Sequence, residues 1–213
     1  MILRRRWIIF ACLLITCGVV GLQIIDARRQ TATSRAKGRL THVWTFVEDY
    51  AQQHGDLPPA ITTNPQAGTQ YSWRTLIMKD MATTEIKSMM STYRFDQDWN
   101  SSENTQCAII LSRAYNYFAD DDALLKPVAS IQALVDAKTI WQREASVDIQ
   151  VLANRPAEIV LVIVPESRVS IFEPRDISKN ELRDAIRKHK SIYALYADRS
   201  FRVLREPAEV AVP

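Results

Sequence analysis

The sequence predicts an α+β protein in which a long N-terminal helix, first transmembrane and then amphipathic, packs on a small antiparallel sheet. Residues 7–25 form an apolar run without a charge, and apolar residues then recur at helical spacing as far as Ala51. Short β-branched runs follow in the last third of the chain, separated by turn residues. Helices that come first and antiparallel strands that come last are typical of α+β folds.

The composition fits one folded domain with an appendage. The chain has 213 residues, of which 47% are hydrophobic and 24% are charged, as in globular proteins. The net charge is only +3 and comes largely from basic residues that flank the apolar run, so no nucleic-acid partner is expected. Cys12 and Cys17 lie inside the run, which leaves Cys107 without a disulfide partner and expected to be a small buried residue.

Residues 7–25 are long enough to cross a membrane, because the hydrocarbon core requires about 20 apolar residues in a helix. A signal peptide has an apolar region of about 7–15 residues, so a retained anchor is favoured and a cleaved form is the alternative. Arg4–Arg6 precede the run and further basic residues follow it closely, so charge alone leaves the orientation open. The predicted anchor residues are Trp7, Phe10, Leu14, Val20 and Ile25.

The anchor is predicted to continue into a soluble helix. From Leu40 to Ala51 the apolar residues follow i, i+3, i+4, i+7 spacing, and Gly55 with the prolines beyond it predicts a helix end near His54. The predicted parts are an N-terminal tail (1–6), a transmembrane helix (7–25), its soluble continuation (26–54) and an α+β head domain (55–213).

The head domain is predicted to contain helices followed by strands. Ser72 is placed to cap a helix that begins at Trp73, and Ser178 with Glu181 forms a capping box. The strands are apolar or alternating runs bounded by turn residues, and the last two are expected to form a hairpin. The predicted elements are a loop over 61–71, helices over 84–91, 130–138 and 179–190, and strands over 158–164, 168–172, 192–197 and 200–204.

Acidic and amide side chains alternate over residues 96–102 like the first ligands of a calcium-binding loop. The EF-hand loop also requires Gly at its sixth position and Glu at its twelfth, where this chain has Ser101 and Cys107. These side chains are therefore expected to hold turns by bonding nearby backbone amides, with Trp99 buried between them. The alternative is a looser divalent-ion site at Asp96 and Asp98 or at Asp120–Asp122.

Trp73 and Arg74 could form a recognition site, but a structural role is the stronger interpretation. A tryptophan that opens a short helix is expected to pack beneath the long helix. Arg74 is expected to bind helix-end carbonyls or a carboxylate such as Asp96 or Glu166. The three histidines are far apart and no catalytic or metal-binding motif is present, so we expect no enzyme activity, no cofactor and no metal. An anchored hydrolase is a weaker alternative.

Several short motifs occur in a characteristic order along the chain. They are Leu57-Pro58-Pro59-Ala60, Ser72-Trp73-Arg74, the group Phe95, Asp96, Asp98, Trp99, Asn100, Ser101 and Asn104, then Glu166, Phe172-Glu173-Pro174-Arg175-Asp176, His189 and Ala197-Asp198-Arg199-Ser200-Phe201-Arg202-Val203-Leu204. With these motifs the chain resembles a large bacterial family of type IV pilin-like and pseudopilin-like proteins whose C-terminal part is a domain of unknown function.

The resemblance implies a single-pass protein of the bacterial inner membrane, with a cytoplasmic N-terminus and a periplasmic or other extracytoplasmic head. It also implies partners among other pilin-like subunits or secretion-type machinery. The chain departs from the family where Arg6 replaces the leader Gly and Ala11 replaces a Glu, which in pilins resembles a counter-charge for a neighbouring subunit's N-terminal amine. An anchored binding or sensing module that has lost polymerisation is therefore the alternative to a structural or assembly protein.

Overall fold

The computed structural model describes residues 2–80, 84–114, 128–167 and 169–210, and for residues 2–17 and 112–114 it describes the backbone alone. The chain divides into two compact units, residues 1–36 and residues 37–213. We refer to residues 37–213 as the folded unit. The protein is an α+β protein with a long N-terminal helix and antiparallel sheets, as predicted.

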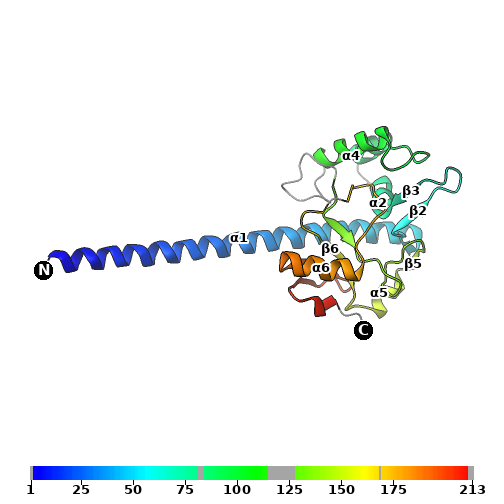
Figure 1. Cartoon of the computed structure of the whole chain (residues 1–213). Helices are drawn as coiled ribbons and strands as arrows, with labels where there is room; N and C mark the ends of the chain where they lie inside the picture. Colours follow the sequence, from blue (N-terminus) through cyan, green and yellow to red (C-terminus); the bar gives the residue numbers. More distant parts are fainter. Residues whose placement is uncertain (1, 81–83, 115–127, 168, 211–213) are drawn as a thin grey trace. The chain divides into compact units, whose positions relative to one another are not determined.

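Helix α1 (Ile2–His54) is unbroken, which confirms the predicted long helix (Figure 1). It ends where Gly55 adopts a φ of 87°, a left-handed conformation that favours glycine. The N–H of Gly55 donates to the Ala51 carbonyl at 2.8 Å and so satisfies a helix-end acceptor. No helix has an apolar stretch long enough to cross a membrane among the residues whose side chains are described.

The folded unit continues from α1 through short elements. Their bounds are β1 (Asp56–Leu57), β2 (Ile61–Thr63), β3 (Gln70–Ser72), α2 (Trp73–Asp80), α3 (Thr84–Met90), α4 (Ser102–Ala114), β4 (Ile131–Ala133), β5 (Val147–Asp148), α5 (Gln150–Asn154), β6 (Ile159–Ile163), α6 (Lys179–His189), β7 (Ile192–Tyr196), β8 (Phe201–Leu204) and the 3₁₀ helix η2 (Pro207–Val210).

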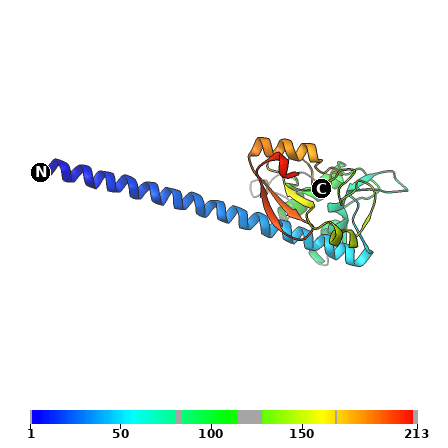
Figure 2. The same ribbon diagram turned by 90° about the horizontal axis from the view of Figure 1, so that it is seen from below.

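The main sheet has the strand order β4-β6-β7-β8, and all of its neighbouring strands are antiparallel. Ile163 of β6 lies opposite Ile131 of β4 and Tyr193 of β7. Every residue of β6 is buried, because this inner strand is covered on both faces. Figure 2 shows the sheet between α6 and residues 37–54 of α1.

Apolar side chains fill both sides of the main sheet. Leu182 and Ile186 of α6 belong to one core cluster with Val162, Ala194 and Leu204 of the sheet. Of the predicted apolar positions of α1, Leu40, Val43, Trp44, Val47 and Ala51 are each at most 1% exposed, whereas Tyr50 is only half-buried. Burial of this helix face therefore contributes to the core of the folded unit.

Local sequence signals located several elements correctly. Helices α3 and α6 and the β7–β8 hairpin lie where they were expected, and β6 occupies the predicted run before Pro165. The capping box at Ser178 and Glu181 is formed, and Lys190 ends α6 in a left-handed conformation. These elements are specified by nearby residues, so the sequence pattern alone sufficed.

Three predicted elements are wrong. Residues 130–138 are not helical, because Ile131–Ala133 pairs with β6 and a turn follows, in which Thr139 Oγ1 accepts the N–H of Asp136 at 2.7 Å. Residues 61–71 are not only a loop, since β2 and β3 form a hairpin. Of the predicted strand over 168–172, only Ser170 pairs, in an isolated antiparallel bridge with Val128, and the chain turns at Ile171–Phe172, where the Glu173 carboxylate accepts the Ser170 N–H at 3.0 Å; Arg168 is outside the described residues.

Helix α4 lies in a part of the chain where only turns were expected. Ser102, interpreted as a turn residue, begins the helix, and Ser101 accepts the backbone N–H of Asn104 at 3.2 Å as an N-cap. Cys107 lies on α4 and is 1% exposed, as expected for a small buried residue.

Candidate functional site: a buried ion pair and the cavities beside it

A fully buried ion pair joins α2 to the segment before α6. The side chains of Arg74 and Asp176 are 0% and 2% exposed, and Arg74 Nη1 donates to Asp176 Oδ1 at 2.8 Å. The other guanidinium nitrogens donate to backbone carbonyls: Nε to Ile171 at 3.1 Å, and Nη2 to Glu173 at 2.8 Å and to Arg175 at 2.9 Å. One arginine side chain therefore holds the whole 171–176 segment against α2.

The partner expected for Arg74 is wrong. Asp96 is exposed and lies 4.0 Å from Arg94, and Glu166 is exposed and pairs with Lys188 at 3.0 Å. The carbonyls that Arg74 binds belong to a loop and not to a helix end. The partner of Arg74 is Asp176 instead, because the segment before α6 lies against α2.

The Asp176 carboxylate connects three elements. Both of its oxygens accept the indole N–H of Trp73 at 3.0 Å, and Oδ1 also accepts the backbone N–H of Ala133 on β4 at 2.8 Å. Burial raises the pKa of Asp176, and the Arg74 guanidinium, the indole and the amide oppose that rise by stabilising the carboxylate. Since all of these neighbours donate, they fit the ionised form.

A second tryptophan, Trp141, connects Trp73 to the long helix. The ring centroid of Trp73 is 4.8 Å from that of Trp141, which is 6.2 Å from that of Trp44 on α1. All three rings are at most 2% exposed, and Trp141 Nε1 donates to the Pro58 carbonyl at 2.7 Å. This is a packed structural layer with satisfied polar groups at Trp73 and Trp141.

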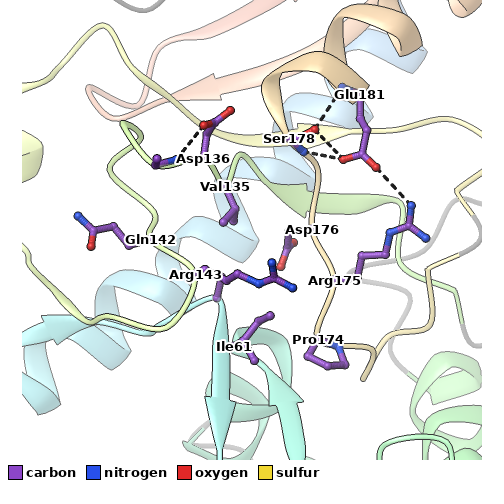
Figure 3. A pocket seen from close by; sticks show the side chains of 12 residues that line it. Ile61, Val135, Asp136, Gln142, Arg143, Pro174, Arg175, Asp176, Ser178 and Glu181 are labelled. Carbon is purple, nitrogen blue, oxygen red and sulfur yellow. Dashed lines mark hydrogen bonds and ion pairs between the residues drawn. The ribbon is translucent and has the colours of Figure 1, made fainter.

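A cavity of about 770 Å³ opens beside the ion pair (Figure 3). Three stretches of chain supply its walls: the start of β2, residues 135–143, and the segment that leads into α6. Asp176 is at its inner wall, and more exposed side chains surround it. The lining residues are Ala60, Ile61, Val135, Asp136, Ala137, Gln142, Arg143, Pro174, Arg175, Asp176, Ser178 and Glu181.

The charged groups of this cavity are unequally satisfied. Arg175 pairs with Glu181 at 3.3 Å, and Glu181 also accepts hydrogen bonds from Ser178. Asp136 Oδ1 accepts the N–H of Ala137 at 2.8 Å. The guanidinium of Arg143 makes no hydrogen bond or ion pair with any described residue, and it projects into the cavity in Figure 3.

A second cavity of about 430 Å³ shares Arg175, Asp176 and Glu181 with the first. Lys188 and His189 of α6 line it together with Glu166, which adopts a φ of 56°. The two cavities therefore meet at the Arg175–Glu181 ion pair.

The calcium-like stretch is organised by one asparagine. Asn104 is 0% exposed, its Oδ1 accepts the N–H of Arg94 at 2.7 Å, and its Nδ2 donates to the carbonyls of Arg94 at 3.0 Å and Asp98 at 2.9 Å. The prediction of a buried Trp99 is wrong, because Trp99 is only half-buried and Asn104 holds the turn instead. Among the described residues, no group of His, Cys, Asp and Glu could hold a metal ion, and Asp120–Asp122 lie outside those residues.

The other predicted positions do not converge on one site. Ser72 Oγ accepts the Thr75 N–H at 3.4 Å at the start of α2, and Asp198 Oδ1 accepts the Ser200 N–H at 2.8 Å in the β7–β8 turn. Of the anchor residues, Val20 and Ile25 are 46% and 49% exposed, whereas the side chains of Trp7, Phe10 and Leu14 are outside the described set. The remaining positions are Pro59, which is half-buried, Asn100, which is exposed, and Pro174, Glu166 and His189, which line the cavities.

Sequence reasoning missed Trp141 and Arg143. Both lie in a stretch without clear periodicity, and neither belongs to a known motif. Their role depends on the backbone bonds from Ala60 and Ile61 to the carbonyls of Gln142 and Arg143, at 3.2 and 2.7 Å, which no local pattern specifies.

No family model, no curated protein and no solved structure matches this chain. The buried ion pair has no exposed face and acts as framework, whereas the cavities offer polar and charged groups for binding.

Proposed function

We propose that this chain is a membrane-anchored, pilin-like structural or assembly protein without enzymatic activity. The proposal rests on exposed apolar residues at the first positions of α1 whose side chains are described. Five of the six exposed large hydrophobic residues among the described side chains lie between positions 19 and 25. They are Val19, Val20, Leu22, Ile24 and Ile25, with exposed fractions of 46–69%.

These side chains point in all directions around α1. Successive residues of a helix are rotated by about 100°, so positions 19, 20, 22, 24 and 25 cover every face. A helix that is apolar on one side fits a protein partner, whereas one that is apolar all round fits a lipid environment or the interior of an assembly. Together with the uncharged run 7–25, this pattern supports a membrane anchor.

The mechanism we propose is mechanical. Residues 37–54 of α1 are part of the core of the folded unit, so the same helix that enters the membrane would hold the extracytoplasmic head. By the family resemblance, the N-terminus would be in the cytoplasm of a bacterium and the anchor in the inner membrane. The partners would be other pilin-like subunits of a type II secretion or type IV pilus-like assembly.

Membrane extraction of the expressed full chain tests the anchor. We expect the protein to stay in the membrane after carbonate washing and to be released by detergent. Leu22→Arg places a charge in the anchor and should increase the carbonate-extracted fraction, because a central charge costs roughly 2.5–3.5 kcal/mol on insertion scales. Gln30→Arg, also on α1, is the matched control and should behave as wild type. Complete release of the wild type by carbonate would contradict the anchor.

A sensing module is the second candidate function. Arg143, which lines the cavity and has no ionic partner among the described residues, favours it, as do Arg6 and Ala11 at the positions where pilins have Gly and Glu. Purification from membranes separates the two functions: co-purifying pilin-like chains support assembly, and a monomer supports sensing. N-terminal sequencing of the same material adds a second readout, since cleavage between Arg6 and Trp7 is expected only of a processed subunit.

A further inference from the structure

The segment of α1 that directly follows the proposed anchor carries an excess of positive charge. Between positions 26 and 37 the chain has four basic residues and one acidic residue, Asp26, and the next acidic residue is Glu48. The basic residues are Arg28, Arg29, Arg35 and Lys37, and their side chains are exposed. We propose that this segment binds the headgroups of anionic phospholipids, with Arg28 and Arg29 as the residues that contact the lipid phosphate.

This headgroup contact rests on the proposed anchor, because the apolar run fixes the depth of the segment in the membrane. The last residue of the uncharged run is Ile25. A helix rises about 1.5 Å per residue, so Arg28 and Arg29 lie about 4.5 and 6 Å beyond the run. The polar headgroup layer is roughly 5–7.5 Å thick on each side of the hydrocarbon core. Both guanidinium groups are therefore at the depth of the lipid phosphates.

The two arginines are open to an external anion. The side chains of Arg28 and Arg29 make no hydrogen bond or ion pair with any residue that the structure describes. The carboxylate of Asp26 accepts a hydrogen bond from Gln30 Nε2 at 3.3 Å. A single carboxylate neutralises at most one of the four cations, so the segment keeps a net positive charge.

Other polar side chains of the segment are already bonded within α1. Thr31 Oγ1 donates to the Ala27 carbonyl at 2.8 Å, and Thr33 Oγ1 donates to the Arg29 carbonyl at 2.9 Å. Residues 26–35 also include none of the aromatic or large aliphatic side chains that carry most of the binding energy of protein interfaces. The guanidinium groups are thus the main binding groups of this segment, which favours a lipid headgroup over a protein partner.

The chemistry of a lipid phosphate matches this arrangement. A guanidinium group offers parallel N–H donors and a permanent positive charge, and both suit a phosphate. Each Lys or Arg near an anionic membrane surface strengthens the attraction about fivefold. Arg35 lies on the same face of the helix as Arg28, because seven residues make almost two turns, and it extends the positive charge about 15 Å beyond the run.

The test uses the full chain in micelles of a zwitterionic detergent at pH 6, with ¹⁵N-labelled arginine. The Nε–H signals of the two arginines are assigned from the single variants Arg28→Gln and Arg29→Gln, in each of which one signal disappears. The probe is short-chain phosphatidylglycerol, and its control is phosphatidylcholine with the same acyl chains. Glycerol 3-phosphate is titrated as the free anion. We expect phosphatidylglycerol to shift both signals and the other two to act at least tenfold more weakly.

Variants connect these shifts to lipid binding in a bilayer. Wild-type protein purified from vesicles with equal amounts of the two lipids should retain more phosphatidylglycerol than phosphatidylcholine. Replacing both Arg28 and Arg29 by Gln should lower this ratio at least twofold, whereas replacing both by Lys keeps the charge and should preserve it. Lys138→Gln combined with Arg205→Gln is the matched control, because it removes two exposed cations outside α1 and should leave the ratio unchanged.

Three results would overturn the headgroup contact. They are the absence of a shift with phosphatidylglycerol, equal shifts with phosphatidylcholine or glycerol 3-phosphate, and a wild-type lipid ratio when both arginines are Gln. If wild-type protein resists carbonate extraction but gives one of these results, the headgroup contact is refuted and the anchor stands. If carbonate releases the wild type while its arginine signals respond to phosphatidylglycerol alone, the anchor is refuted and the headgroup contact stands.

Discussion

Replacing Asp176 by Asn tests whether the buried ion pair stabilises the folded unit. The substitution keeps the size of the side chain and removes its charge. The Asn oxygen can still accept from Trp73 and Ala133, but Arg74, which is 0% exposed, loses its only anionic partner among the described residues. The change therefore isolates the charge from the packing.

The expected loss of stability is about 3 kcal/mol. Removing one partner of a buried ion pair typically costs about 3–5 kcal/mol, because the other charge stays buried without compensation. The lower end applies here because Arg74 keeps hydrogen bonds to the carbonyls of Ile171, Glu173 and Arg175. A loss of this size lowers the ratio of folded to unfolded protein by more than about a hundredfold.

Urea unfolding of the full chain, followed by tryptophan fluorescence in one detergent, measures this loss from the transition midpoint and slope. Arg175→Met is the matched control, because it removes an ion pair of the same segment whose side chains are 61% and 49% exposed. The control should lose at most about 1 kcal/mol. If Asp176→Asn loses no more than this control, the carboxylate does not stabilise Arg74 as we argue.

Asn104→Ala should cost about 2–3 kcal/mol in the same assay, because it leaves buried backbone groups without partners, whereas the exposed Asn100→Ala should stay within about 0.5 kcal/mol. Gly55→Ala should destabilise by about 1 kcal/mol or more because φ is positive there, and Gly38→Ala within α1 should stabilise by about 0.5–1 kcal/mol; equal effects would refute this. Partial burial acts to raise the pKa of Glu181, but the hydrogen bonds from Ser178 and Arg175 outweigh it, so that the pKa is lowered. The resulting stability is present above the unfolded pKa of about 4.3 and is lost as pH falls through the folded value, so Glu181→Gln should show a smaller loss of urea midpoint below that pH than wild type does.

Elements that depend on neighbouring residues could be predicted from the sequence. Gly55 predicted the end of α1, and the Ser178–Glu181 capping box predicted the start of α6. Strand β4 could not be predicted, because Ile131–Ala133 becomes extended through pairing with β6, about 30 residues later in the chain. In that stretch the tertiary contact outweighs the local preference.

The candidate site was less predictable than the fold for the same reason. Arg74 and Asp176 are 102 residues apart, and a carboxylate at Asp96 or Glu166 is chemically equivalent in sequence. Only the chain path decides among the three. Arg143 carries no local signal at all, since an exposed arginine between polar residues is ordinary until a cavity is found beside it.

The residues of the short sequence motifs and Arg143 lie in different structural settings. Trp73, Arg74 and Asp176 come from separate motifs and meet in one buried cluster, and Asn104, from another, closes a buried turn. Such residues specify a framework, because a buried and fully bonded side chain has no group left for a ligand. Arg143 belongs to none of the motifs, lines a cavity and has a guanidinium that makes no bond to any residue that the structure describes. Chains that share the motifs would therefore share this framework, while substitution of the exposed Arg143 would leave the framework folded.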